Sequence, residues 1–185
     1  MAEAPLVGEP LALDLVNTRP SGADLLSTRD DLANWLALQA ERFPELAVAR
    51  PTSADLAAVH AVRDHIGAIL DALIRDRRPP TDALRELNAA QAAAPAIRQL
   101  EWGGAAVIAT MRRDGTAAER LAAVLAEAAT DLLTDPSIGK LKRCEADDCV
   151  LLFLPAHPRR RWCSPERCGN RVRVARYYQR HKLAD

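Results

Sequence analysis

Four cysteines in the second half of the chain have the type and the spacing to hold a metal ion. Cys144 pairs with Cys149 and Cys163 with Cys168, with four residues inside each pair and thirteen between the pairs. Two local pairs that each supply two thiolates are typical of a tetrahedral zinc site. Structural disulfides and a redox pair are the alternatives. We read no export signal in residues 1–20 and no close Cys-x-x-Cys pair, and we therefore expect Zn²⁺.

The residues around these cysteines predict the scaffold that must position them. Residues 150–163 read as a strand, a proline-bounded turn and a second strand that delivers Cys163. Ser164 is a helix cap and Pro165 suits the first helical position, so Cys168 would face the metal from the opening turn of a helix. A knuckle, a hairpin and a ligand-bearing helix describe a small treble-clef-like zinc finger. Its core is too small to fold reliably without the metal.

Charge is divided unevenly along the chain, although the formal net charge is zero. Residues 1–139 contain 13 Lys/Arg and 20 Asp/Glu, whereas residues 140–185 contain 12 and 5. A helix that begins near Pro165 would place Arg173, Arg176 and Arg180 on one face. Such a face neutralises phosphates and favours nucleic-acid binding by counterion release. The candidate nucleic-acid-binding residues are Arg159, Arg160, Arg161, Asn170, Arg171, Arg173, Arg176, Arg180 and Lys182.

Other interpretations of the basic surface stay open. The arginines would dock on an acidic protein or on the acidic first part of the chain, in a zinc-stabilised interaction module. RNA is a further partner, because Tyr177 and Tyr178 offer rings for base stacking. A treble-clef scaffold also hosts HNH-type nucleases, but His157 lies in a proline-bounded turn, and neither it nor His181 has an adjacent acid. We therefore expect a protein that is not an enzyme.

Residues 1–139 predict a domain that is mainly helical. Capped amphipathic helices are expected over residues 27–40, 52–78, 81–94 and 116–135. Two apolar runs around Gly103 and Gly104 predict a β-hairpin. The fold class is thus mainly α (α+β), with a helical domain over residues 1–139 and the zinc finger over residues 140–185. No apolar run reaches the roughly 18 residues of a membrane span, so we expect a cytoplasmic protein without membrane contact.

Two segments resemble known families. The tail "RCEADDCVLLFLPAHPRRRWCSPERCGNR" resembles the CGNR zinc finger, named for the tetrapeptide at residues 168–171. "LALDLVNT", followed by "TRDDLANWL", resembles the opening of the ABATE domain that precedes this finger in bacterial proteins described as stress-induced transcription regulators. The resemblance spans nearly the whole chain. It implies that the four cysteines bind zinc, that the finger binds DNA, and that the first domain senses stress or a ligand.

The polar residues of "LALDLVNT" admit two interpretations. Asp14 and Asn17 lie three apart on one helical face and would line a pocket for a small-molecule effector. Alternatively, they cap or buttress neighbouring elements. The sequence as a whole predicts a DNA-binding transcription regulator whose activity is modulated by an effector or by formation of a homodimer.

Overall fold

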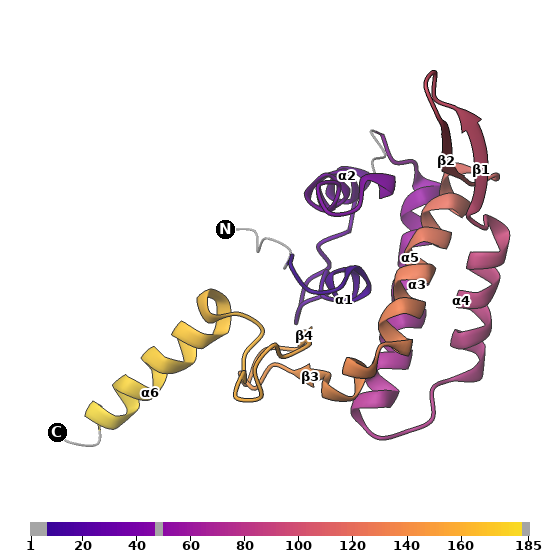
Figure 1. Ribbon diagram of the computed structural model, residues 1–185. Coiled ribbons are helices and arrows are strands. Elements are labelled where there is room, and N and C mark those ends of the chain that lie inside the picture. Colours follow the sequence, from indigo (N-terminus) through magenta and orange to yellow (C-terminus); the bar gives the residue numbers. More distant parts are fainter. Residues whose placement is uncertain (1–6, 47–49, 183–185) are drawn as a thin grey trace.

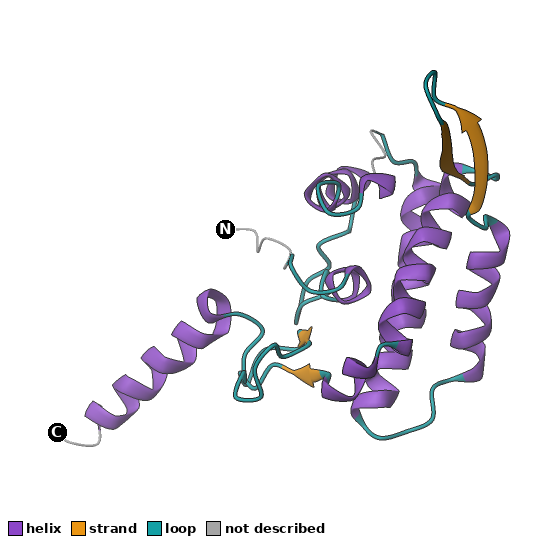
Figure 2. Cartoon of the chain, in the orientation of Figure 1, coloured by secondary structure: helices purple, strands orange, loops and turns teal. Residues whose placement is uncertain are grey.

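The computed structural model describes residues 7–46 and 50–182, with only the backbone described for Arg176 and residues 178–182 (Figure 1). Helices dominate the fold, and two small antiparallel sheets accompany them (Figure 2). This arrangement confirms the expected fold class. The helices are α1 (Leu11–Val16), α2 (Arg29–Gln39), α3 (Ser53–Ile74), α4 (Thr81–Ala93), α5 (Ala117–Thr134) and α6 (Asn170–Lys182).

Three of these helices begin at threonine capping boxes. Thr28, Thr52 and Thr116 each accept a hydrogen bond from the backbone N–H three residues later, at the starts of α2, α3 and α5. The acid at that later position accepts in return from the N–H of the threonine. Each box satisfies two backbone donors that a helix start leaves without partners. Local sequence therefore determines where these helices begin.

The main hydrophobic core lies between α1, α2, α3, α4 and α5. Helices α3, α4 and α5 pack side by side, and α1 packs against α3 and α5 (Figure 1). Ile66 and Leu70 of α3 and Leu125 of α5 are fully buried. Leu13 and Leu15 of α1 are buried as completely, although α1 has only six residues. A helix this short is marginal in isolation, so its position depends on what surrounds it.

A partly buried ion pair ties α3 to the loop that follows α1. The Arg63 guanidinium donates to both carboxylate oxygens of Asp24, at 2.7 and 2.6 Å, and to Thr18 Oγ1 at 2.9 Å. Arg63 is 2% exposed. Although burial opposes it, Arg63 lowers the pKa of Asp24 to about 2. The carboxylate therefore stays ionised, and it neutralises a charge that the core cannot hold alone.

We expect Asp24→Asn to lower the free energy of unfolding by about 2 kcal/mol, because it leaves a buried guanidinium with a weaker acceptor. Urea denaturation measures the change. Asp64→Asn is the matched control, since Asp64 pairs with Arg19 at 2.7 Å on the surface. An exposed pair contributes little, and this variant should stay within about 0.5 kcal/mol of the wild type. Equal losses in the two variants would contradict the argument.

A β-hairpin follows α4. Strand β1 (Ile97–Trp102) pairs with β2 (Val107–Arg112), and Trp102 opposes Val107 next to the turn. The N–H of Gly103 donates to the Ala106 carbonyl at 2.9 Å, and Gly104 has a φ of 89°. This left-handed conformation favours glycine, and it explains why the predicted hairpin turns here. The hairpin extends beyond the ends of the helices (Figure 1).

The strands beside the cysteines differ from the sequence-based expectation. Strand β4 (Leu152–Phe153) pairs with β3 (Lys142–Arg143), which directly precedes Cys144. The expected second strand before Cys163 is wrong, since the described residues 154–163 form no strand. Pro155 and Pro158 provide the physical reason, because proline has no N–H to donate to a strand ladder and fixes φ in turns. No helix within residues 7–46 and 50–182 is long and apolar enough to cross a membrane.

Candidate metal centre

The structure brings the four cysteines together in one cluster. Their Sγ atoms all lie within 4.8 Å of one another, and Cys149 Sγ lies 4.0 Å from Cys163 Sγ. All four are free thiols. Four sulfur atoms bound to one tetrahedral Zn²⁺ at 2.3 Å would lie about 3.8 Å apart. The arrangement therefore fits a single four-coordinate metal ion after a small contraction.

Two backbone turns hold the ligands in place. The N–H of Cys144 donates to the Leu151 carbonyl and the N–H of Cys149 to the Ala146 carbonyl, each at 2.9 Å. A third hydrogen bond links the two cysteine pairs, because the N–H of Cys163 donates to Cys144 Sγ at 3.4 Å. Such N–H donors stabilise thiolate charge. These hydrogen bonds thus position the first three ligands, and the bond to sulfur favours the thiolate of Cys144.

Cys168 comes from a short helical turn, as predicted, but this turn is a π-helix over Pro165–Gly169. Ser164 Oγ accepts from the N–H of Arg167 at 3.0 Å, and Pro165 occupies the first turn, so both expected start signals are confirmed. Helix α6 continues from this turn at Asn170. Helix α6 therefore begins two residues after the metal ligand Cys168.

Burial governs the acidity of the thiols. It raises the pKa of Cys149 to about 12, and it also raises the pKa of Cys163. Burial opposes ionisation of Cys144 too, but N–H donors of Ala146 and Cys163 bring the pKa of this thiol below its usual value. Thiols packed this closely cannot all ionise alone, and a divalent cation relieves the repulsion by replacing their protons. The four cysteines form a metal site.

A small apolar cluster, the finger cluster, surrounds the site. It consists of the four cysteines with Ala146, Leu151, Phe153, Trp162 and Val172. Phe153 is fully buried, whereas its neighbour Leu152 belongs to the main core between the helices. Adjacent strand residues point to opposite faces, so one dipeptide of β4 reaches both apolar regions.

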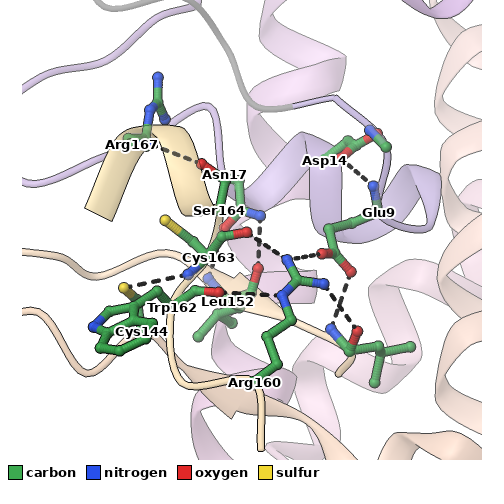
Figure 3. Close-up of polar contacts among 12 residues, drawn as sticks. Glu9, Asp14, Asn17, Cys144, Leu152, Arg160, Trp162, Cys163, Ser164 and Arg167 are labelled. Carbon is green, nitrogen blue, oxygen red and sulfur yellow. Dashed lines mark hydrogen bonds and ion pairs between the residues drawn. The ribbon is translucent and has the colours of Figure 1, made fainter. Parts of the chain in front are cut away.

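Asn17 joins α1 to the finger. It caps the C-terminal end of α1, and its Nδ2 donates to the Leu152 carbonyl at 2.8 Å. The N–H of Leu152 donates back to Asn17 Oδ1 at 2.8 Å (Figure 3). Both bonds are buried. The amide side chain therefore pairs with β4 as a neighbouring strand would.

Arg160 makes the second link, and its role differs from the predicted one. Its guanidinium donates to Glu9 Oε1 at 2.7 Å, to the Trp162 carbonyl at 3.1 Å and to the carbonyl of the metal ligand Cys163 (Figure 3). It also lies 4.4 Å from the centre of the Phe153 ring. Arg160 is thus a half-buried residue between the finger and the residues before α1. Nothing local in the sequence marks its partner Glu9.

Asp14 holds the segment that carries Glu9. Its carboxylate accepts from the N–H groups of Gly8 and Glu9 and from the side chains of Gln39 and Arg42. Burial raises the pKa of Asp14, and these four donors oppose the rise. Arg42 donates in addition to the Glu9 carbonyl at 2.7 Å. Asp14 and Asn17 are therefore engaged by the protein itself, and an effector pocket at these residues stays a prediction.

The remaining candidate nucleic-acid residues are distributed over the finger. Arg161 pairs with Glu145 at 2.5 Å, and Arg171 pairs with Asp148 at 2.5 Å. Arg173 donates to Asn170 Oδ1 at 3.0 Å within α6. Arg159, Asn170, Arg171 and Arg173 are exposed. The side chains of Arg176, Arg180 and Lys182 lie outside the described part, although the backbone of α6 includes all three.

Comparison with known proteins identifies two families along the chain. The ABATE family, described as "Putative stress-induced transcription regulator", matches residues 9–136, which is more than half of the 185 residues. The CGNR zinc finger matches residues 140–181 and thus contains all four cysteines. No curated protein matches the chain significantly. The chain belongs to the ABATE family and carries a CGNR zinc finger after the ABATE region.

Proposed function

We propose that this protein is a DNA-binding transcription regulator whose finger is held together by one Zn²⁺ ion. Four thiolates in a tetrahedral arrangement select Zn²⁺ or an iron–sulfur centre, and the zinc-finger family favours the former. When bound, the zinc would supply the charge that keeps four buried thiolates together. Elemental analysis of purified protein should find one zinc per chain. A cytoplasmic location suits this proposal, because a reducing compartment keeps the thiols available.

The observation that carries the DNA-binding proposal is the basic helix α6. It continues the turn that contains Cys168, and residues 167–182 include six Lys/Arg and no acid. Figure 1 shows α6 extending away from helices α1 to α5. Its 13 residues span about 20 Å, and the major groove of B-DNA accommodates a helix of this kind. A metal-anchored helix would therefore present its arginines on a rigid support.

The ion pairs of the finger leave this surface available to phosphates. Arg161 and Arg171 pair with exposed acids, and exposed ion pairs contribute only about 0–1 kcal/mol. A phosphate can replace such a partner at little cost. Arg160 is different, because its guanidinium already donates to Glu9 and to backbone carbonyls. We therefore leave Arg160 out of the proposed DNA-contacting residues.

Zinc-loaded protein should bind a random DNA duplex with an affinity that falls steeply with salt, as measured by fluorescence anisotropy. The variant Arg173→Ala/Arg176→Ala/Arg180→Ala should bind more weakly. Its plot of log affinity against log salt should be shallower by about 3, since each lost phosphate contact removes roughly 0.9 from the slope.

The matched control for this titration is Arg75→Ala/Arg77→Ala/Arg85→Ala. It removes three exposed arginines from the ABATE region, with side chains that are 57%, 59% and 71% exposed. It makes the same change in net charge, yet its salt slope should match that of the wild type. Equal slopes for all three proteins would contradict the assignment to α6. A folded, zinc-loaded sample that binds no duplex at low salt would favour an acidic protein partner instead.

We further propose that the role is regulatory and not catalytic. His157 lies exposed in a turn, where its Nδ1 accepts from the Arg159 N–H at 3.2 Å. A general base would instead need a free ring nitrogen aimed at the reacting proton, with the other nitrogen held by an acid, whereas Nδ1 of His157 accepts a backbone hydrogen bond. Stress or a small-molecule effector would act on the ABATE region, and Glu9 and Asn17 would transmit the change, because both bond directly to the finger.

A further inference from the structure

The β1–β2 hairpin has an apolar face that no other part of the described chain covers. Strand residues alternate between faces, and the register places Leu100, Trp102, Val107 and Met111 on the same one. These side chains are 79%, 69%, 64% and 62% exposed. They are the large apolar residues of this face, which we call the hairpin face. It is a continuous apolar surface at the end of the molecule opposite α6 (Figure 1).

The sequence of the hairpin is unusual for a β-hairpin that is exposed to solvent on both faces. No charged residue lies between Glu101 and Arg112. Solvated edge strands usually carry Lys, Glu or Pro, which protect them from pairing with other chains. A two-stranded hairpin is also marginally stable in water unless one of its faces packs on something. The hairpin face therefore has the composition of a surface that becomes buried.

We propose that the hairpin face packs against the same face of a second copy of this chain, around a two-fold axis. Four large side chains that are about two thirds exposed offer on the order of 500 Å² per copy. A stable interface needs roughly 800 Å² per partner, so the neighbouring surface must supply the rest. A two-fold contact requires a self-complementary surface, and an apolar face meets this requirement.

The surroundings of the hairpin supply that additional surface. A hollow of about 580 Å³ lies at the base of the hairpin, and its wall combines the apolar residues Met111, Leu121 and Val124 with the charged residues Glu45, Arg113, Arg120 and Glu127. If the two hairpins run antiparallel, the uncharged tip of each reaches the hollow of the other. The one charge on the hairpin face, Arg98, then lies far from its copy across the axis, so no like charges meet.

Sedimentation equilibrium of the zinc-loaded full chain tests the proposal. The wild type should approach twice the chain mass of 20.2 kDa as its concentration rises. The variant Leu100→Thr/Trp102→Thr should remain at the mass of one chain. Both positions are exposed and threonine suits strands, so circular dichroism and zinc content should match the wild type. Gln99→Thr/Glu101→Thr is the matched control, because these residues lie on the opposite face of β1 and the dimer should persist.

Hydrogen exchange provides a second readout that locates the contact. Amides within residues 97–112 should exchange more slowly at high protein concentration in the wild type and in the control variant, but not in Leu100→Thr/Trp102→Thr. A wild type that stays monomeric at all concentrations would overturn the proposal. So would a dimer that survives in Leu100→Thr/Trp102→Thr, or one that is lost equally in the control.

Discussion

Cys163→Ser should release the metal and unfold the finger over residues 144–182, while α2 to α5 remain folded. The change removes one of four thiolates, and structural zinc contributes on the order of 10–16 kcal/mol to domains of this size. The finger cluster around the site contains few large apolar side chains, chiefly Leu151, Phe153 and Trp162, and cannot replace that energy. Elemental analysis should show the loss of zinc, and limited proteolysis should cut within residues 144–182.

Val150→Ser is the control for this experiment. Val150 lies next to Cys149 and is 38% exposed, so the substitution introduces a serine beside the site without removing a ligand. This variant should keep one zinc per chain and resist proteolysis. Treatment of the wild type with a strong chelator should reproduce the effect of Cys163→Ser. Retention of zinc and of the native proteolysis pattern in Cys163→Ser would show that the four-thiolate assignment is wrong.

Asn17→Leu should lower the free energy of unfolding by about 4 kcal/mol. Leucine has a similar size but cannot form hydrogen bonds with the backbone of Leu152. In the wild type, the N–H and the carbonyl of Leu152 both form buried hydrogen bonds with Asn17. Each buried backbone group left without a partner costs about 1–3 kcal/mol. Urea denaturation measures the loss, and faster hydrogen exchange at the Leu152 amide would locate it.

The control is Asn88→Leu. Asn88 is an exposed residue of α4, so the same substitution there should change stability by less than about 0.5 kcal/mol. If Asn17→Leu also changed so little, the contact between α1 and β4 would not be a stabilising one. A large loss of stability without faster exchange at Leu152 would place the damage elsewhere in α1.

The features that were predictable from the sequence depend on residues that lie close together in it. The capping boxes at Thr28, Thr52 and Thr116, the hairpin turn at Gly103–Gly104 and the Ser164–Pro165 helix start are each defined within a few residues. The cysteine pairs have the same property, because each closes one backbone turn. Local hydrogen bonding and backbone geometry determine such features, so the sequence displays them directly.

The features that could not be predicted depend on distant residues. Glu9 and Arg160 are 151 positions apart, and Asn17 and Leu152 are 135 apart. A single sequence shows that Arg160 is basic, but not that its guanidinium lies against Glu9 instead of facing solvent. Tertiary packing, and not local preference, decided these two cases. The strand before Cys163 was predicted wrongly for a different, local reason, because Pro155 and Pro158 disfavour a strand there and β4 pairs with β3 instead.

The position of Leu152 has a consequence for how the finger is held against the rest of the protein. Leu152 is anchored in the main core while Phe153 lies in the finger cluster, so the finger cannot swivel without pulling a leucine out of the core. The finger cluster is therefore held against the main core, and helix α6 is joined to it through the Pro165–Gly169 turn. In a two-fold dimer joined at the hairpins, the spacing of the two recognised DNA segments would be dictated by the body of the protein. Lengthening the hairpin would then change the distance between the two copies of α6 without altering any residue of the finger.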